Sequence, residues 1–170
     1  MKAEELRELQ APIKSLYREI PDQAVFTLKA QGDLGDGLTC KVETGRGLAL
    51  AGLHPKTGGD GLSLCSGDML LEALVACAGV TLNAVATALD LKLRGATVHA
   101  EGDIDARGTL GVDKNAPVGF REIRLRFDID SDASPDQLDT LVKLTERYCV
   151  VFQSLNRRPE LKVSRSARTA

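Results

Sequence analysis

The middle of the chain carries a long run of mostly apolar positions, from Met69 to Leu89. Ser66 precedes the run as a possible N-cap, and Asp68 stands in the first turn, where a negative charge is favourable. Four polar residues interrupt the run: Glu72, Thr81, Asn83 and Thr87. Although the run is long enough for a membrane span, these interruptions and the Gly-rich and acidic flanks favour a core helix. Because a helix that is apolar nearly all round must be enclosed, the pattern predicts a buried central helix from Ser66 to about Leu89.

Alternating apolar and polar positions predict strands ahead of this helix. Residues 24–30 and 38–43 alternate on either side of the Gly-rich segment 32–37, which is typical of an antiparallel hairpin with a turn at 32–37. Residues 48–53 form a third predicted strand. The Gly-rich stretch that follows is a loop by composition.

Two longer alternating segments follow the helix, over residues 96–105 and 122–129. Each has one apolar and one charged face, as in an antiparallel sheet with one side in water. Ser134 and Gln137 have the spacing of a capping box and predict a helix that ends near Cys149. A short apolar piece and a last strand at 161–163 close the chain.

Residues 3–20 repeat apolar side chains at helical spacing and predict an N-terminal helix broken at Pro12. The resulting order of elements predicts an α+β fold. We expect one domain over residues 1–170, because the sequence contains neither an internal repeat nor a linker.

Composition narrows the classes of partner. Hydrophobic residues make up 43% and charged residues 27% of the chain, which is typical of a globular protein. The net charge of −2 and the absence of Trp argue against nucleic-acid binding and against an acidic membrane as a partner. The charged first residues do not resemble a secretory signal, so we expect a cytoplasmic protein.

The candidate chemistry lies in four cysteines: Cys40, Cys65, Cys77 and Cys149. None belongs to a Cys-x-x-Cys pair, so we expect no cofactor and no structural zinc. Cys40 falls on the apolar face of a predicted strand, where cysteine packs as a small hydrophobe. Cys65 precedes the N-terminus of the central helix, a position that favours reactive thiols. Cys77 in mid-helix and Cys149 at a helix end are, taken singly, more often structural than functional.

The segments around Cys77 and Cys149 nevertheless carry a family pattern. Residues 66–77, SGDMLLEALVAC, resemble the central-helix motif of the OsmC/Ohr family of osmotically induced and organic hydroperoxide resistance proteins. That motif is an acidic residue followed by Leu-Leu-x-Ala-Leu-x-Ala-Cys. Residues 146–149, ERYC, resemble the family's second-cysteine motif, and residues 118–123 resemble the strand before it.

The resemblance covers residues 23–165 in the family's order and leaves residues 1–22 as an N-terminal helical extension. It implies an OsmC-like fold, in which antiparallel sheets wrap a long buried central helix. It also implies an intertwined homodimer, in which strands of both chains enclose each central helix.

The resemblance further implies a cysteine-based thiol peroxidase that reduces organic hydroperoxides and, less well, hydrogen peroxide. Cys77 would be the peroxidatic thiolate that is oxidised to a sulfenic acid. Cys149 would resolve the sulfenic acid as an intramolecular disulfide, and a dithiol reductant would then reduce the pair.

Such a reaction needs a thiolate, whereas an ordinary thiol with a pKa of about 8.5 is only about 3% ionised at pH 7. The family stabilises the thiolate with an Arg near the first hairpin, held by an acidic residue ahead of the central helix. Residues 32–37 contain no Arg, so Arg46 is the expected counterpart. Asp68 is the expected acid, and Glu72 is an alternative. Asp68 lies half a turn out of phase with Cys77, so it contributes only through an irregular first turn or a neighbouring chain.

Two other hypotheses remain open. The missing hairpin Arg favours a non-catalytic dimeric protein that holds a small hydrophobic ligand in an apolar pocket between subunits. A metal site formed by His54, Cys65 and Cys77 is a weaker third reading. The pKa of Cys77 separates the first two hypotheses, because a value above about 8 supports binding alone.

Overall fold

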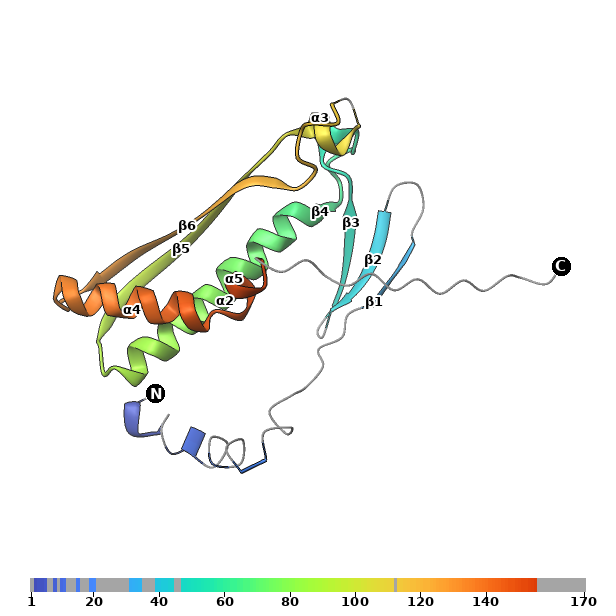
Figure 1. The fold of residues 1–170 in the computed structure, drawn as a ribbon. Helices are drawn as coiled ribbons and strands as arrows, with labels where there is room; N and C mark the ends of the chain where they lie inside the picture. Colours follow the sequence, from blue (N-terminus) through green and yellow to red (C-terminus); the bar gives the residue numbers. More distant parts are fainter. Residues whose placement is uncertain are drawn as a thin grey trace.

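In the part of the chain that the structure describes, two sheets and several helices pack around one long helix. The structure, a computed structural model, describes residues 47–111 and 113–155 without a break, together with residues 31–34 and 39–44 and parts of 2–20. The elements, in chain order, are β1 (Gln31–Leu34), β2 (Thr39–Thr44), β3 (Gly47–Gly52), the short 3-10 helix η2 (Pro55–Thr57), β4 (Leu64–Cys65), α2 (Ser66–Ala88), β5 (Leu93–Ile104), α3 (Ala106–Thr109), β6 (Phe120–Ser131), α4 (Pro135–Tyr148) and α5 (Val150–Ser154) (Figure 1).

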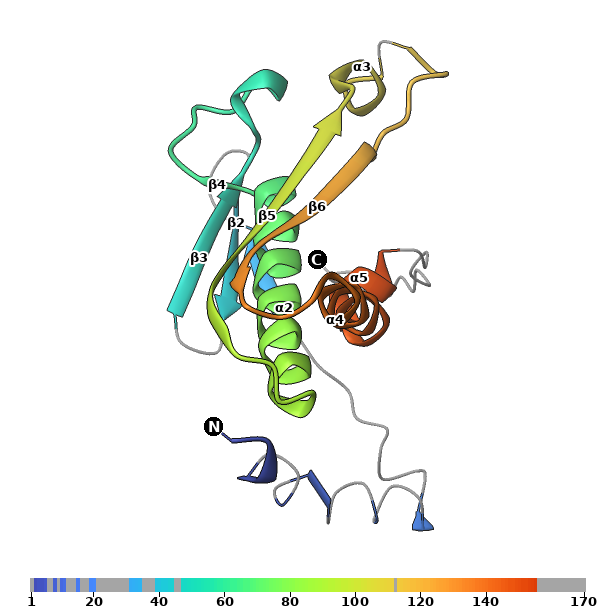
Figure 2. The same cartoon turned by 90° about the vertical axis from the view of Figure 1, so that its left-hand side faces the viewer.

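The central helix α2 packs against β5 and against α4 and α5, as the two views of the fold show (Figures 1 and 2). Its buried side chains recur at three- and four-residue steps and form one stripe: Leu74, Ala78, Leu82, Val85 and Ala86. Leu141 of α4 is fully buried against the second half of this stripe. Among the described helices, α2 alone has the length and hydropathy of a membrane span. Its packing against β5, α4 and α5 confirms the predicted central helix.

A single chain encloses α2 only in part. Val80 keeps 73% of its surface exposed, and Leu70 keeps 39%. Other large apolar side chains outside α2 are also exposed, among them Leu48 at 66% and Leu62 at 87%. The expectation that α2 is covered on nearly all sides is therefore not met by one chain alone.

The first sheet has the strand order β1-β2-β3-β4. β1 pairs with β2 and β2 with β3 in antiparallel fashion, and β4 pairs in parallel with β3. The hairpin turn predicted at 32–37 is wrong in its first half, because residues 31–34 form β1 and Gly32 pairs with Val42. Strand pairing uses backbone groups, and the context of the sheet overrides the weak strand propensity of Gly and Asp. The strand predicted at 24–30 lies outside the described residues.

The second sheet is the long antiparallel hairpin of β5 and β6. Its apolar face packs on α2 through side chains that include Val98, Ile123, Leu125 and Phe127. Its outer face carries exposed ion pairs, such as Arg124 with Asp103 and the Nε2 of His99 3.0 Å from the Oδ2 of Asp128. The apolar and charged residues of β5 and β6 therefore alternate as predicted, with the charged face of the sheet exposed to solvent. Exposed ion pairs of this kind contribute little to stability.

The α4 helix begins as predicted. Ser134 Oγ accepts a hydrogen bond from the backbone N–H of Gln137, and Gln137 Oε1 accepts one from the N–H of Ser134 at 2.9 Å. Cys149 ends α4 with φ −71° and ψ 106°, and α5 begins at the next residue. The strand predicted at 161–163 lies outside the described residues, and so does half of the N-terminal helix predicted over 3–20, including Pro12.

Candidate active site

Cys77 and Cys149, which are far apart in the sequence, lie together in the fold. Cys77 is partly buried on α2, and Cys149 is 1% exposed at the junction of α4 and α5. Both belong to one apolar cluster with Leu74 and Ala78. The Cys149 thiol donates a hydrogen bond to the sulfur of Cys77. The structure therefore brings together the two cysteines of the predicted pair.

Local backbone geometry places Cys149 at this point. Its N–H donates to the carbonyl of Thr145 at 2.9 Å, which completes the last turn of α4. Its extended ψ then turns the chain out of α4. The carbonyl of Cys149 accepts from the N–H of Gln153 at 3.0 Å as α5 begins. The first N–H groups of α5, on Val150 and Val151, consequently reach the sulfur of Cys77.

The environment of Cys77 favours its thiolate. Burial by itself raises the pKa of the Cys77 thiol, but hydrogen bonds from four groups outweigh burial. In order of size, these come from the backbone of Val151, the side chain of Cys149, the backbone of Val150 and the hydroxyl of Thr81. Because each donor stabilises the negatively charged sulfur, the pKa of Cys77 lies below its ordinary value.

Cys149 has the opposite balance. Burial raises the pKa of the Cys149 thiol most; the backbone N–H of Phe152 lowers it, the neighbouring Cys77 raises it again, and the backbone of Val151 lowers it least. The pKa values of the two thiols therefore move apart, with Cys77 the first to ionise. A thiolate next to a protonated thiol is the arrangement that oxidation by a peroxide followed by disulfide formation requires.

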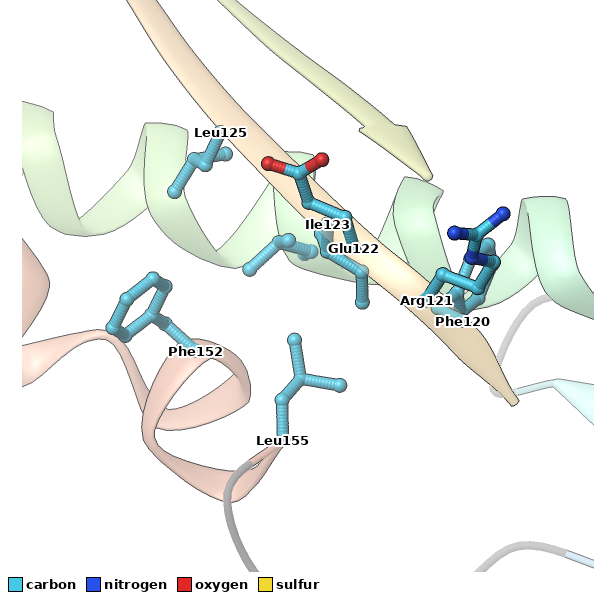
Figure 3. A pocket seen from close by; sticks show the side chains of 8 residues that line it. Phe120, Arg121, Glu122, Ile123, Leu125, Phe152 and Leu155 are labelled. Carbon is cyan, nitrogen blue, oxygen red and sulfur yellow. The ribbon is translucent and has the colours of Figure 1, made fainter. Parts of the chain in front are cut away.

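Two cavities share Leu125 and Phe152, which pack on the apolar cluster that holds the two cysteines. One, of about 320 Å³, lies between β6 and α5 (Figure 3). Ile123, Leu125, Phe152 and Leu155 face this cavity, while the charged ends of Arg121 and Glu122 point away from it. The other, of about 270 Å³, shares Leu125 and Phe152 with the first and includes Cys149 in its wall. A small apolar group has room beside Cys149.

The remaining predicted site residues are not part of this cluster. Asp68 is exposed and lines a separate cavity of about 230 Å³ with His54 and Cys65. The wall of that cavity contains neither Cys77 nor Cys149. As its helical phase predicts, Asp68 does not reach Cys77 within one chain. Arg46 lies outside the described residues.

Over the described part of the chain, none of the groups that shift the pKa of Cys77 is cationic. Within the same residues, His, Cys, Asp and Glu side chains do not gather into a group that could hold a metal. His54 and Cys65 share a cavity from which Cys77 is absent, so the structure does not support a metal site from these three residues.

Sequence reasoning missed the donors around Cys77. The N–H groups of Val150 and Val151 are backbone atoms without a sequence signature. Thr81 did carry a signal, because it stands four positions after Cys77 on a predicted helix and shares its face. In the sequence, Thr81 stands out only as one of the polar residues that interrupt the apolar run of the central helix.

Comparison with known proteins places the fold. The family model of OsmC-like protein matches residues 58–164. Among solved structures, an OsmC-like protein from Mycoplasma pneumoniae is similar, with a TM-score of 0.64 and 18% identity over 76% of this chain and 87% of that chain. An organic hydroperoxide resistance protein OsmC from Legionella pneumophila has a TM-score of 0.61 and 16% identity over 78% of this chain and 90% of that chain.

An organic hydroperoxide resistance protein from Elizabethkingia anophelis also has a TM-score of 0.61, with 17% identity over 78% of this chain and 89% of that chain. At such identities these three structures show a common fold. No curated protein matches the sequence. Because the family model matches more than half of the residues and the fold is shared, the chain belongs to the OsmC-like protein family.

Proposed function

We propose that the protein is a thiol peroxidase that reduces organic hydroperoxides in the cytoplasm, with Cys77 as the peroxidatic and Cys149 as the resolving cysteine. The observation that carries the proposal is the hydrogen-bonded thiol pair, in which the pKa of Cys77 is lowered and that of Cys149 is raised. Membership of the OsmC-like family supports it, as do similar structures named as organic hydroperoxide resistance proteins.

The reaction balances with two thiols for each hydroperoxide. The Cys77 thiolate attacks the outer oxygen of the substrate, the O–O bond breaks, and the alkoxide leaves and takes up a proton as an alcohol. The Cys149 sulfur then attacks the sulfenic acid sulfur of Cys77 and expels hydroxide, which leaves as water with the proton of Cys149. A dithiol reductant supplies the two electrons that return the disulfide to two thiols.

The cavities on either side of Phe152 support an organic substrate. The wall of the second cavity is mostly apolar and includes Cys149, and apolar side chains also line part of the first. An alkyl or aryl group loses contact with water there, which is worth about 25 cal/mol for each Å² buried. Hydrogen peroxide has no such group, so it is expected to be the poorer substrate.

Two further parts of the proposal concern the assembly. Arg46 is the proposed cation that stabilises the Cys77 thiolate, and Asp68 the proposed acid that holds it. Since Asp68 does not reach the thiols within one chain, we place this contact across an intertwined homodimer. The exposure of Val80 on α2 supports a dimer, because an apolar side chain in mid-helix gains from cover by a second copy.

The experiment is consumption of cumene hydroperoxide with dithiothreitol as reductant. Cys77→Ser is expected to abolish turnover, and Cys149→Ser to stop it after one equivalent with a sulfenic acid that dimedone traps at Cys77. Cys65→Ser is the matched control and is expected to keep full activity, because Cys65 lies in a different cavity. If Cys77 stays reduced after hydroperoxide treatment, the proposal is wrong.

A second function is favoured by one specific observation: the donors to Cys77 in the described residues are all neutral. Such a site suits a non-catalytic protein that holds a small hydrophobic ligand in these cavities. This function predicts saturable binding of an apolar fluorescent probe and a Cys77 pKa above about 8. A lower pKa together with peroxide turnover rules it out.

A further inference from the structure

Thr81 stands one helical turn after Cys77 on α2 and faces the same side of that helix. Its Oγ1 lies 2.8 Å from the backbone oxygen of Cys77, to which the hydroxyl donates a hydrogen bond. The side chain is partly buried. The same hydroxyl is also within hydrogen-bonding reach of the Cys77 sulfur.

A threonine hydroxyl has one proton and turns about its C–O bond toward the better acceptor. While Cys77 is protonated, the backbone oxygen is the better acceptor, and the hydroxyl lies within hydrogen-bond distance of it. When Cys77 ionises, the negatively charged sulfur becomes the stronger acceptor, because hydrogen bonds to ionised groups are about twice as strong as neutral ones. One small rotation of the hydroxyl then moves its proton from the oxygen to the sulfur.

We propose that Thr81 is a positioning residue of the peroxidatic centre, whose hydroxyl turns from the Cys77 carbonyl to the Cys77 sulfur when that sulfur becomes a thiolate. The proposal rests on the proposed function. Among the side chains that donate to Cys77 in the described residues, Cys149 gives up its proton when it resolves the sulfenic acid, whereas Thr81 keeps its own. Thr81 is therefore the side-chain donor that remains through the cycle.

The hydrogen bond to the carbonyl is not by itself the argument. Thr87 on the same helix makes the same bond to the backbone oxygen of Asn83, also at 2.8 Å. This bond is a common feature of Thr within helices. What distinguishes Thr81 is the sulfur beside it, and Thr87 therefore offers a matched control.

The test is the pKa of Cys77, measured by the pH dependence of its alkylation by iodoacetamide in the full chain, with Cys77 identified by peptide mapping. Thr81→Val keeps the shape and removes the hydroxyl. It is expected to raise the pKa of Cys77 by about one unit and to slow alkylation at pH 7 about tenfold. Thr81→Ser restores the hydroxyl and is expected to restore the pKa. Thr87→Val is expected to leave it unchanged.

The outcomes separate this proposal from the proposed function. An unchanged Cys77 pKa in Thr81→Val, with peroxide turnover intact in the natural chain, overturns the role of Thr81 alone. So does a pKa that Thr81→Ser fails to restore. A natural chain whose Cys77 resists hydroperoxide overturns the proposed function instead. If Thr81→Val does not fold, Thr81→Ala against Thr81→Ser gives the same comparison.

Discussion

The Cys149 thiol donates a hydrogen bond to the sulfur of Cys77, and this one contact moves the two pKa values in opposite directions. Cys149 must keep its proton in order to donate a hydrogen bond to the Cys77 thiolate. Ionisation of Cys77 therefore makes ionisation of Cys149 harder, which sets the order of events. Cys77 can attack the substrate as a thiolate while Cys149 is still a protonated thiol.

The first prediction tests this contact. Cys149→Ala removes a donor from the Cys77 thiolate and is expected to raise the pKa of Cys77 by about one unit. Cys149→Ser keeps a donor and is expected to hold the pKa near that of the natural chain. The measurement is the rate of Cys77 alkylation between pH 5 and 10.

The direction of the pKa shift of Cys77 determines how the alkylation of Cys77 depends on pH. Because the native pKa of Cys77 is lowered, alkylation of the natural chain should reach its plateau below the range of a free thiol, whose pKa is about 8.5. The plateau of Cys149→Ala should lie at higher pH. Coincident profiles for the natural chain and Cys149→Ala would show that the thiol contact has no effect on ionisation.

The second prediction concerns substrate size. Phe152 lines both cavities, one of which includes Cys149 in its wall. Phe152→Ala joins them and is expected to raise kcat/KM for cumene hydroperoxide relative to tert-butyl hydroperoxide by about tenfold, since apolar pockets discriminate by roughly that factor. Val118→Ala, at an exposed position, is the control. An unchanged ratio would place the substrate elsewhere.

The third prediction concerns the core between α2 and α4. Leu141 is 0% exposed and packs on Leu82, Val85 and Ala86. Leu141→Ala is expected to lower the free energy of unfolding by about 2–5 kcal/mol, through lost burial and the cavity that remains. Leu138→Ala, at a partly buried position of the same helix, is expected to cost less. Urea unfolding followed by circular dichroism measures both, and equal losses would contradict the packing described.

The fourth prediction tests the dimer. Val80 is 73% exposed in one chain, and Val80→Asp is expected to convert a homodimer into monomers because it places a charge in an apolar interface. Sedimentation equilibrium gives the mass. Thr97→Asp introduces the same charge on the wet face of β5 and should leave the mass unchanged. A monomeric natural chain would remove the basis for this prediction.

Elements with strong local patterns could be predicted from the sequence. The apolar run of α2, the alternation of β5 and β6 and the capping box at Ser134 each specify an element through contacts along the chain. The parallel pairing of Leu64–Cys65 with β3 could not be predicted, because only two residues pair and the fold alone brings them together. The strand at 31–34 was missed for a related reason, since its Gly and Asp residues are typical of turns.

The candidate site could be predicted less fully than the fold. The pairing of Cys77 with Cys149 followed from the family resemblance, because neither spacing nor composition connects two residues so far apart. The helical phase of Asp68 correctly placed it away from Cys77 within the chain. The backbone donors of Val150 and Val151 depend on where α5 begins, and that is decided by tertiary packing rather than by residue type.

Cys149 is also the residue at which α4 ends and α5 begins. A disulfide between Cys149 and Cys77 would connect the junction of α4 and α5 to the middle of α2, and it would close a loop of about 70 residues. In the chain-entropy description, closing such a loop restricts the unfolded chain and raises stability by about 4 kcal/mol. The oxidised protein would accordingly be the more stable form, and the rise in its melting temperature would report the fraction of molecules that carry the disulfide.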